Sequence, residues 1–385
     1  MTASGPLAGI TVIDLSRILA GPYCTFLMAE LGARVIKVEP PGKGDDAREY
    51  GPFVNGRSTY FASVNRGKES IALDLKSAGD QCIFEALLAR ADVIVENFRP
   101  GTMEKLGYGW ERLHPRYPRL IYAATSGFGH TGPFSHYPAY DMVVQGLGGI
   151  MSITGHPGQP PVRIGMSIGD IGAGLYTTVA VNAALVHREK TGEATKVDVA
   201  MFDCQLALLE NAIMRYTVTG TVPGPLGARH PSITPFEAFA TADGAMIIAA
   251  GNDALYLKLC DALGRPDLAA APGYKTNDLR SRNQATLKAE IESELKKQPT
   301  SAWIPLIERA GIPCGPINTV AQALAHPQVE ARNMLVTTED PVAGTLRLAG
   351  NPLKLSAFPD PPTRPPAPAL DADRARLLKE LGIEE

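Results

Sequence analysis

Cysteine is scarce in this 385-residue sequence, which holds five copies far apart in the chain. They are Cys24, Cys82, Cys204, Cys260 and Cys314. Because no two of them form a C-x-x-C pair, neither a zinc knuckle nor a disulfide framework is predicted. Buried free thiols in a reducing cytosol are the simplest interpretation, so we expect a cytoplasmic protein.

Other features are absent as well. The formal net charge is −3 and lysine and arginine form no run, which argues against a nucleic-acid partner. No apolar run reaches the ~18 residues that cross a bilayer, and the N-terminus does not resemble a signal peptide, so we expect no membrane segment. The seven histidines show no metal-ligand spacing. We therefore expect no metal site and no tightly bound cofactor.

Strand-like and helix-like patterns alternate from residue 10 to about 125. Buried-strand patterns occur at 10–15, 34–39, 70–75, 92–98 and 120–125, and helical patterns at 23–31 and 77–90. This alternation predicts an α/β fold with an open, mostly parallel, Rossmann-like sheet covered by helices. Ligands of such sheets bind at the carboxyl ends of the strands.

The length and composition predict more than one domain. Glycine and proline are concentrated in 219–229, which indicates a boundary. A hairpin pattern at 236–250 and amphipathic helices at 277–297 and 301–310 follow, and they predict a smaller α+β domain. We expect a large domain over 1–220, a small domain over 225–325, and a C-terminal segment over 330–385.

A glycine motif, G-x-G-x-x-G, occurs at 127–132, but it follows a late strand and precedes Pro133. The dinucleotide fingerprint belongs on the first strand-to-helix turn, where this chain has Ala20-Gly21-Pro22. A dinucleotide-dependent oxidoreductase is therefore disfavoured.

The most informative stretch covers 161–188 and reads PVRIGMSIGDIGAGLYTTVAVNAALVHR. Asp170 falls at the N-cap or first turn of a long apolar helix, expected over Ile171 to Arg188, where the positive helix end favours a carboxylate anion. Asp170 is a candidate nucleophile, but it could also only cap the helix. Alternatively, 165–169 match G-x-S-x-G, and Ser167 would be the nucleophile of a hydrolase.

Further short motifs occur in a fixed order along the chain. They are PLAGITVID from Pro6, LAGP from Leu19, GARVIKVEP from Gly32, NFRPG from Asn97, Tyr140-Asp141 with Gln145, IGD ending at Asp170, and HREKTG from His187. Each is weak alone, but together they resemble the class III CoA-transferases, of the formyl-CoA transferase or CaiB–BaiF type, over nearly the whole chain.

The resemblance implies an acyl-CoA:carboxylate CoA-transferase with Asp170 as its nucleophile. Coenzyme A or acyl-CoA would be a substrate, passed from an acyl donor to an acceptor acid through an aspartyl-CoA thioester. The helix N-terminus would keep Asp170 ionised and stabilise oxyanions. The resemblance also implies an interlocked homodimer, in which the C-terminal segment returns to the large domain.

Contacts with coenzyme A are implied residue by residue. They are Ile18, Leu19, Ala20, Leu73, Asp74, Leu75, Lys76, Asn97, Phe98, Arg99, Lys105, Ala139, Tyr140 and Asp141. Some family members carry a phosphate-binding arginine directly after the second strand, where this chain has Pro40. We expect Lys37, Lys43 or Arg48 to substitute for it.

Two rival functions are weaker. The related α-methylacyl-CoA racemases have a histidine where Tyr140 stands, and a tyrosine with a pKa near ~10 is a poor acid–base group at neutral pH. A serine hydrolase would need Ser167 with Asp203 and His230 or His326, and this chain lacks an HGGG-type oxyanion loop.

The acceptor acid stays open at this stage. The stretch 249–253 only partly echoes the glycine-rich lid of formyl-CoA transferase, which argues against an oxalate-specific enzyme. Arg229-His230-Pro231 resembles members that handle short dicarboxylates such as succinate or glutarate. A cation there could hold the distal carboxylate, or it could be a plain loop charge.

Overall fold

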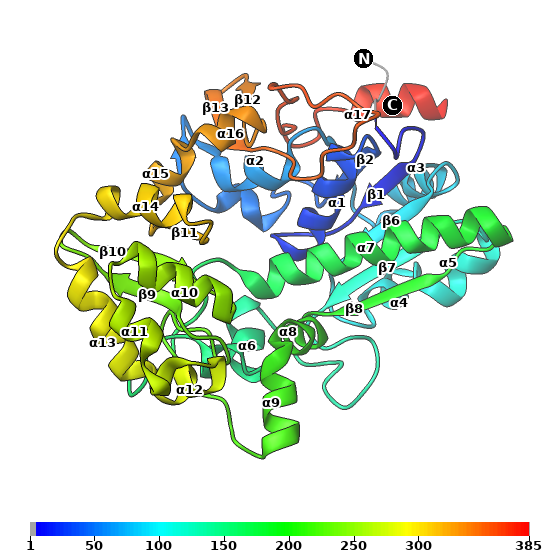
Figure 1. Ribbon diagram of the computed structural model, residues 1–385. Helices are drawn as coiled ribbons and strands as arrows, with labels where there is room; N and C mark the ends of the chain where they lie inside the picture. The colour runs from blue at the N-terminus through cyan, green and yellow to red at the C-terminus, as the bar shows by residue number, and fades with distance from the viewer. Residues whose placement is uncertain (1–4, 385) are drawn as a thin grey trace. The chain divides into compact units, whose positions relative to one another are not determined.

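The computed structural model describes residues 5–384 and forms two compact units (Figure 1). Of the described residues, the larger unit holds those up to Ser152, Arg163–Pro223 and those from Pro327 onward. The smaller unit holds Ile153–Val162 and Gly224–His326. Residues 153–162, which the sequence-based division places in the large domain, group with the smaller unit, where Gly227 N–H donates to the Gly155 carbonyl at 2.8 Å.

The larger unit is built on a six-stranded sheet with the order β5-β2-β1-β6-β7-β8, in which every pair is parallel. Its strands are β1 (Thr11–Asp14), β2 (Arg34–Glu39), β5 (Glu69–Ala72), β6 (Val93–Glu96), β7 (Ile121–Ser126) and β8 (Lys196–Ala200). The predicted Rossmann-like parallel sheet is therefore confirmed. The chain builds outward from β1 in one direction and from β6 in the other, so the switch point lies between these two strands.

Helices cover both faces of this sheet. Successive side chains of a strand point to opposite faces, so β1 supplies Val12 to one apolar core and Ile13 to the other. The helices of the first core are α1 (Ala20–Glu30) and α7 (Ile168–Thr191). Those of the second include α3 (Ala78–Leu88), α4 (Thr102–Leu106), α5 (Trp110–Arg116) and α17 (Arg374–Leu381).

The C-terminal segment covers the free edge of β5. The carboxylate of Asp373 accepts the Ser70 N–H at 2.8 Å, and that of Asp371 accepts the Ala72 N–H at 2.7 Å. These two aspartates satisfy strand donors that would otherwise lie exposed at a sheet edge. Of the described residues, the N-terminal and C-terminal ones therefore belong to the same unit.

The other elements of the larger unit are short. They are η1 (Asp46–Glu49), β3 (Phe53–Val54), β4 (Arg57–Ser58), α2 (Thr59–Asn65), α6 (Asp141–Leu147), α8 (Met201–Leu209), α9 (Asn211–Thr219), α16 (Pro327–Ala331), β12 (Leu335–Asp340) and β13 (Gly344–Ala349). The 3₁₀ turn η2 (Ile150–Ile153) lies where the chain first passes to the smaller unit.

The smaller unit packs helices on an antiparallel sheet. Its strands are β9 (Phe236–Ala240), β10 (Ala245–Ala249) and β11 (Cys314–Pro316), and the predicted hairpin is the β9–β10 pair. Its helices are α10 (Asp253–Ala262), α11 (Pro266–Ala270), η3 (Pro272–Tyr274), α12 (Asn277–Arg282), α13 (Gln284–Leu295), α14 (Thr300–Arg309) and α15 (Val320–Leu324).

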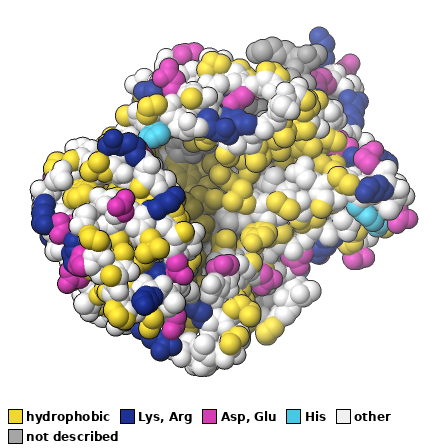
Figure 2. All heavy atoms as spheres, in the orientation of Figure 1, with side chains coloured by type: hydrophobic (Ala, Val, Ile, Leu, Met, Phe, Trp, Pro, Cys, Tyr) yellow, Lys and Arg dark blue, Asp and Glu magenta, His cyan; other side chains and the backbone are white. Residues whose placement is uncertain are grey.

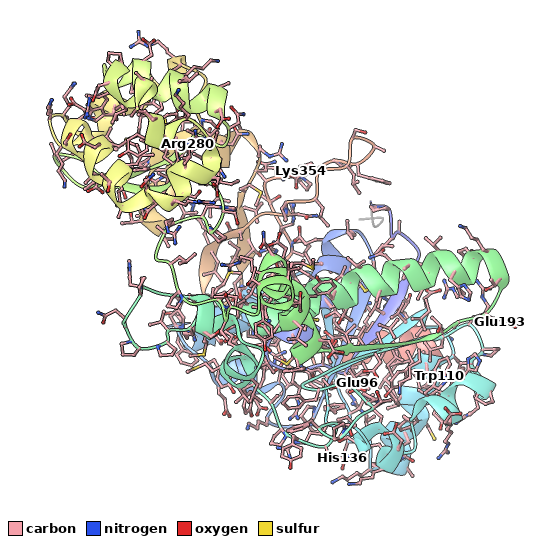
Figure 3. All side chains as sticks on the ribbon, turned by 60° about the horizontal axis from the view of Figure 1, so that its bottom comes forward. Glu96, Trp110, His136, Glu193, Arg280 and Lys354 are labelled. Atoms are coloured by element: carbon pink, nitrogen blue, oxygen red, sulfur yellow. The ribbon has the colours of Figure 1, made fainter. Side chains whose placement is uncertain are left out.

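One predicted helix of this unit, 277–297, is in fact two. The chain breaks at Asn283, whose side-chain amide donates to the Gly273 carbonyl at 3.1 Å and the Leu279 carbonyl at 3.0 Å. The fully buried Arg280 (Figure 3) donates to the Thr234 carbonyl at 2.7 Å. Tertiary hydrogen bonds thus override the continuous helical pattern. Within residues 5–384, no helix combines the length and apolar character needed to cross a membrane.

Candidate functional site

A cleft opens at the carboxyl ends of β1, β6 and β7, at the switch point of the sheet. Nine of the residues predicted for the site line it: Ile18, Leu19, Ala20, Asn97, Phe98, Arg99, Ala139, Tyr140 and Asp170. They come from three chain segments and the start of α7, which the sheet brings together at one edge.

The other predicted residues lie outside this lining. Leu73 is buried in an apolar core, and the Asp74 carboxylate accepts the Lys76 N–H at 3.0 Å. Leu75 packs against that core, Lys105 lies on α4, and the buried Asp141 carboxylate accepts the Gly169 N–H. Their contact with coenzyme A stays a prediction.

Asp170 is presented by the first turn of α7. The helix begins at Ile168, three residues earlier than the pattern predicts, so Asp170 is its third residue. The preceding Gly169 donates its N–H to the Asp141 carboxylate at 2.8 Å, and a Cβ there would lie 2.7 Å from Val144. Gln145 holds the other Asp141 oxygen at 2.8 Å. Glycine at 169 therefore lets α6 fix the turn that carries the carboxylate.

The ionisation of Asp170 differs from the prediction. Burial raises the pKa of Asp170 to about 7, and the negative charge of Asp141 adds to the rise. The helix N-terminus therefore favours the anion less than predicted, because removal from water and like charge favour the neutral form, and the carboxylate is only partly ionised near neutral pH. Near neutral pH the group is poised between its acid and its nucleophilic form.

This pKa predicts a pH dependence for any reaction in which Asp170 is the nucleophile. Only the ionised carboxylate attacks, so kcat/KM should be low below pH 7, rise through about 7 and then level off. Replacing Asp141 by asparagine keeps an acceptor for Gly169 but removes the charge, so the rise should move to lower pH. A profile that is unaffected by Asp141→Asn would contradict this, and initial rates across a buffer series measure it.

Tyr60, which the sequence does not single out, interacts electrostatically with Asp170, although it is not among the residues that line the cleft. Burial raises the pKa of its hydroxyl to about 12, and the charge of Asp170 contributes to the rise. The ring makes an edge contact with Tyr50 at a centroid distance of 5.7 Å. The Tyr60 hydroxyl is therefore protonated at neutral pH and lies within electrostatic range of Asp170. No local motif points to Tyr60, because the sequence of residues 44–66 resembles that of an irregular loop.

Two of the predicted substitutes for an arginine at position 40 are unavailable. The fully buried Lys37 ammonium lies 2.9 Å from the Asp45 carboxylate. The Arg48 guanidinium donates twice to Glu39, at 2.7 Å each. Because both cations are already paired with carboxylates inside the protein, neither is free to bind a phosphate. The expectation that Lys37 or Arg48 substitutes for the arginine is therefore wrong.

Arginines 17 and 99 are the cations of the cleft lining. The side chain of Arg17 is 45% exposed and lies 3.4 Å from Asp46, with its guanidinium 5.3 Å from the centre of the Phe98 ring. Lys43, the third predicted substitute, is also exposed and pairs with Asp46 at 2.7 Å.

Asn97 has a different role from that of a free ligand. Its side-chain oxygen accepts the Arg17 N–H at 2.8 Å, and its amide donates to the Arg17 carbonyl at 2.8 Å. The neighbouring Glu96 (Figure 3) accepts the Phe98 N–H at 2.7 Å and the Tyr122 hydroxyl at 3.0 Å. The half-buried Asn97 and the buried Glu96 therefore fix the chain just after β1 and β6.

The rival chemistries find little support in this geometry. None of the described residues that line the cleft is a histidine. Tyr140, at the position of the racemase histidine, is 70% exposed at the N-cap of α6. Ser167 is the N-cap residue of α7, outside the cleft lining, and its hydroxyl does not cap the helix.

Comparison with known proteins gives one consistent result. Residues 7–374 match the profile of CoA-transferase family III. The chain is 48% identical to acetyl-CoA:oxalate CoA-transferase of Acetobacter aceti, covering 99% of this chain and 97% of the relative. It is 38% identical to human succinyl-CoA:glutarate CoA-transferase, covering 98% and 86%. A crystal structure of a CaiB/BaiF family protein from Brucella suis superposes with a TM-score of 0.85 at 38% identity, over 98% of this chain and 100% of that one.

Proposed function

Since this chain belongs to CoA-transferase family III and is an enzyme that moves coenzyme A from an acyl-CoA to a carboxylic acid, we propose that Asp170 is its nucleophile. The observation that carries the proposal is the placement of Asp170. It is a half-buried carboxylate on the first turn of a helix, and it lines the cleft at the switch point of the sheet. No histidine among the described lining residues competes as a base.

The exchange divides into four acyl transfers that conserve charge. The Asp170 carboxylate attacks the thioester carbonyl, the C–S bond breaks, and CoA thiolate leaves a mixed anhydride. The thiolate then attacks the aspartyl carbonyl, which releases the donor acid and leaves an aspartyl-CoA thioester. The acceptor carboxylate attacks this thioester and expels the thiolate. The thiolate finally attacks the acceptor carbonyl, which releases the new acyl-CoA and the Asp170 carboxylate.

The lining residues supply binding and charge stabilisation. Arg17 and Arg99 would hold the phosphates of coenzyme A, since both guanidinium groups belong to the cleft and suit phosphate geometry. Arg17 would then replace the arginine that is missing at Pro40. The protonated Tyr60 hydroxyl and the first N–H groups of α1 would face the oxyanions, because Leu19 at its N-cap gives α1 no side-chain cap.

We propose a short dicarboxylate as the acceptor. The relatives named above act, by their names, on oxalate and on glutarate, which are both short dicarboxylates. Arg229 and His230 lie in the smaller unit, where the His230 ring stacks on Phe236 at 5.2 Å. The sequence argument against oxalate still needs its test, which is a comparison of oxalate, succinate and glutarate as acceptors with one acyl-CoA donor.

A homodimer, interlocked as in the family, is proposed for the assembly. Helix α7 exposes an apolar stripe in which Leu175 is 46%, Val179 67% and Val186 54% exposed. Figure 2 shows hydrophobic side chains gathered where α7 lies in Figure 1. A stripe of this kind on a helix calls for a covering partner. A reducing, cytoplasmic compartment is also proposed, because all five cysteines are free thiols.

The test is to trap the covalent intermediate. After incubation with an acyl-CoA, the intact mass of the protein should rise by one coenzyme A less one water, and hydroxylamine should remove the addition. The Asp170→Ala variant should form no adduct, whereas Ser167→Ala should form it normally. An adduct that persists in Asp170→Ala and disappears in Ser167→Ala would overturn the assignment.

A further inference from the structure

The turn between β1 and α1 contains a strained residue. Ile18 has a φ of +67°, in the left-handed region that a β-branched side chain rarely adopts. It lies between Arg17 and Leu19, and all three line the cleft. A conformation of this kind persists only where the surrounding structure imposes it.

Hydrogen bonds from three other segments impose it. The Asp45 carboxylate accepts the Ile18 N–H at 3.0 Å. The Lys37 ammonium donates at 2.7 Å to the Ser16 carbonyl, which belongs to the peptide group that joins Ser16 to Arg17. The Asn97 side chain binds both the N–H and the carbonyl of Arg17. The two peptide groups on either side of Arg17 therefore each have both their N–H and their carbonyl bound by one of these side chains.

Asp45 joins these contacts. Its second oxygen lies 2.9 Å from the Lys37 ammonium, and both side chains have no exposed surface. Its first oxygen also accepts the Ala47 N–H at 2.9 Å, which anchors the turn η1. A buried ion pair contributes little stability once its desolvation is counted. In this pair, the Asp45 carboxylate and the Lys37 ammonium each also bind the backbone of the turn that lines the cleft.

We infer that Asp45 is a positioning residue, which together with Lys37 holds Ile18 of the Arg17–Leu19 turn in its left-handed conformation and so presets one wall of the cleft that Asp170 also lines. Its kinetic consequence rests on the proposed function. If the turn is already ordered, the binding of acyl-CoA does not include the loss of conformational entropy that ordering the turn would cost. Loss of Asp45 should therefore weaken acyl-CoA binding more than it slows turnover.

The test is a cycle of Asp45→Asn with Ile18→Gly. Asparagine offers one carbonyl oxygen where the carboxylate offers two, so either Ile18 or Lys37 loses its acceptor. Asp45→Asn alone should raise KM for acyl-CoA about tenfold, with a smaller fall in kcat. In the Ile18→Gly background the same change should raise KM less than about threefold, because glycine adopts a positive φ without strain.

A purely structural role would give a different pattern. If Asp45→Asn changes KM by the same factor in both backgrounds, the inference is wrong. Tyr256→Phe is the control: it removes a buried hydrogen bond to the Leu268 carbonyl, at 3.0 Å, within the smaller unit and without any contact to the turn. It should lower stability and leave KM unchanged.

Two further measurements keep the inference testable. We call the side chains of Lys37, Asp45 and Asn97 that hold the turn the clamp. If Asp45→Asn does not fold, Asn97→Ala removes the uncharged member of the clamp, and its effect on KM should likewise be smaller in the Ile18→Gly background. Amide exchange at Ile18 needs no activity: protection should be strong in the natural protein and reduced in the clamp variants. If the natural protein forms no CoA adduct but the clamp variants lose protection at Ile18, the proposed function is wrong and the positioning role of Asp45 stands. If protection at Ile18 is equal in the natural protein and the variants, the positioning role is wrong.

Discussion

Replacing Asp170 by asparagine is expected to lower the kcat of CoA transfer by about 10⁴-fold or more, the scale seen when a covalent nucleophile is removed. The amide is close in size but cannot form the anhydride. The measurement is the steady-state rate of acyl-CoA formation with a dicarboxylate acceptor. Activity within tenfold of the natural protein would show that Asp170 is not the nucleophile.

The same variant should gain stability above neutral pH. The folded pKa of Asp170, about 7, is raised from its ordinary value of 3.8, so the folded state binds a proton that the unfolded state has released. Burying the carboxylate therefore costs stability progressively as pH rises between these two values, and the full cost applies above about 7. Asparagine avoids it. Urea unfolding at pH 8 should show Asp170→Asn to be more stable, which also separates lost chemistry from lost folding.

Replacing Lys68 by methionine is expected to cost about 3–5 kcal/mol of unfolding free energy. The Lys68 ammonium lies 2.9 Å from the Asp14 carboxylate, and neither side chain has exposed surface. It also donates to Thr25 at 2.7 Å and to Asn65 at 2.9 Å. Methionine fills similar space but leaves the Asp14 charge buried without this partner. Urea unfolding measures the loss.

The double variant provides the control. Asp14→Asn removes the orphaned charge, so Asp14→Asn with Lys68→Met should be more stable than Lys68→Met alone. If the double variant loses the sum of the two single losses, the two charges are not coupled. Asp14 also accepts the Ser16 N–H at 2.9 Å, a hydrogen bond that the carbonyl oxygen of asparagine can keep.

Some features of this protein follow from local sequence. The short buried runs predict β1, β2, β6 and β7 because a strand buried on both faces must be apolar throughout, and each of them is a strand. The order of motifs indicates the family, which the match over 7–374 confirms. Glycine 169 and Asp170 stand in one helical turn, so their juxtaposition is visible in the chain itself.

Other features depend on groups that meet only after folding. The sequence indicates an ionised Asp170 at a helix end, whereas packing removes it partly from water near the charge of Asp141 and raises its pKa to about 7. It likewise indicates Lys37 as a phosphate ligand, whereas folding pairs this side chain with Asp45 in the interior. Desolvation and long-range charge depend on what surrounds a group in three dimensions. The sequence by itself therefore determined the family, the parallel sheet and the position of the carboxylate, and only the tertiary structure decided its ionisation, its electrostatic coupling to Tyr60 and the contacts that hold Ile18.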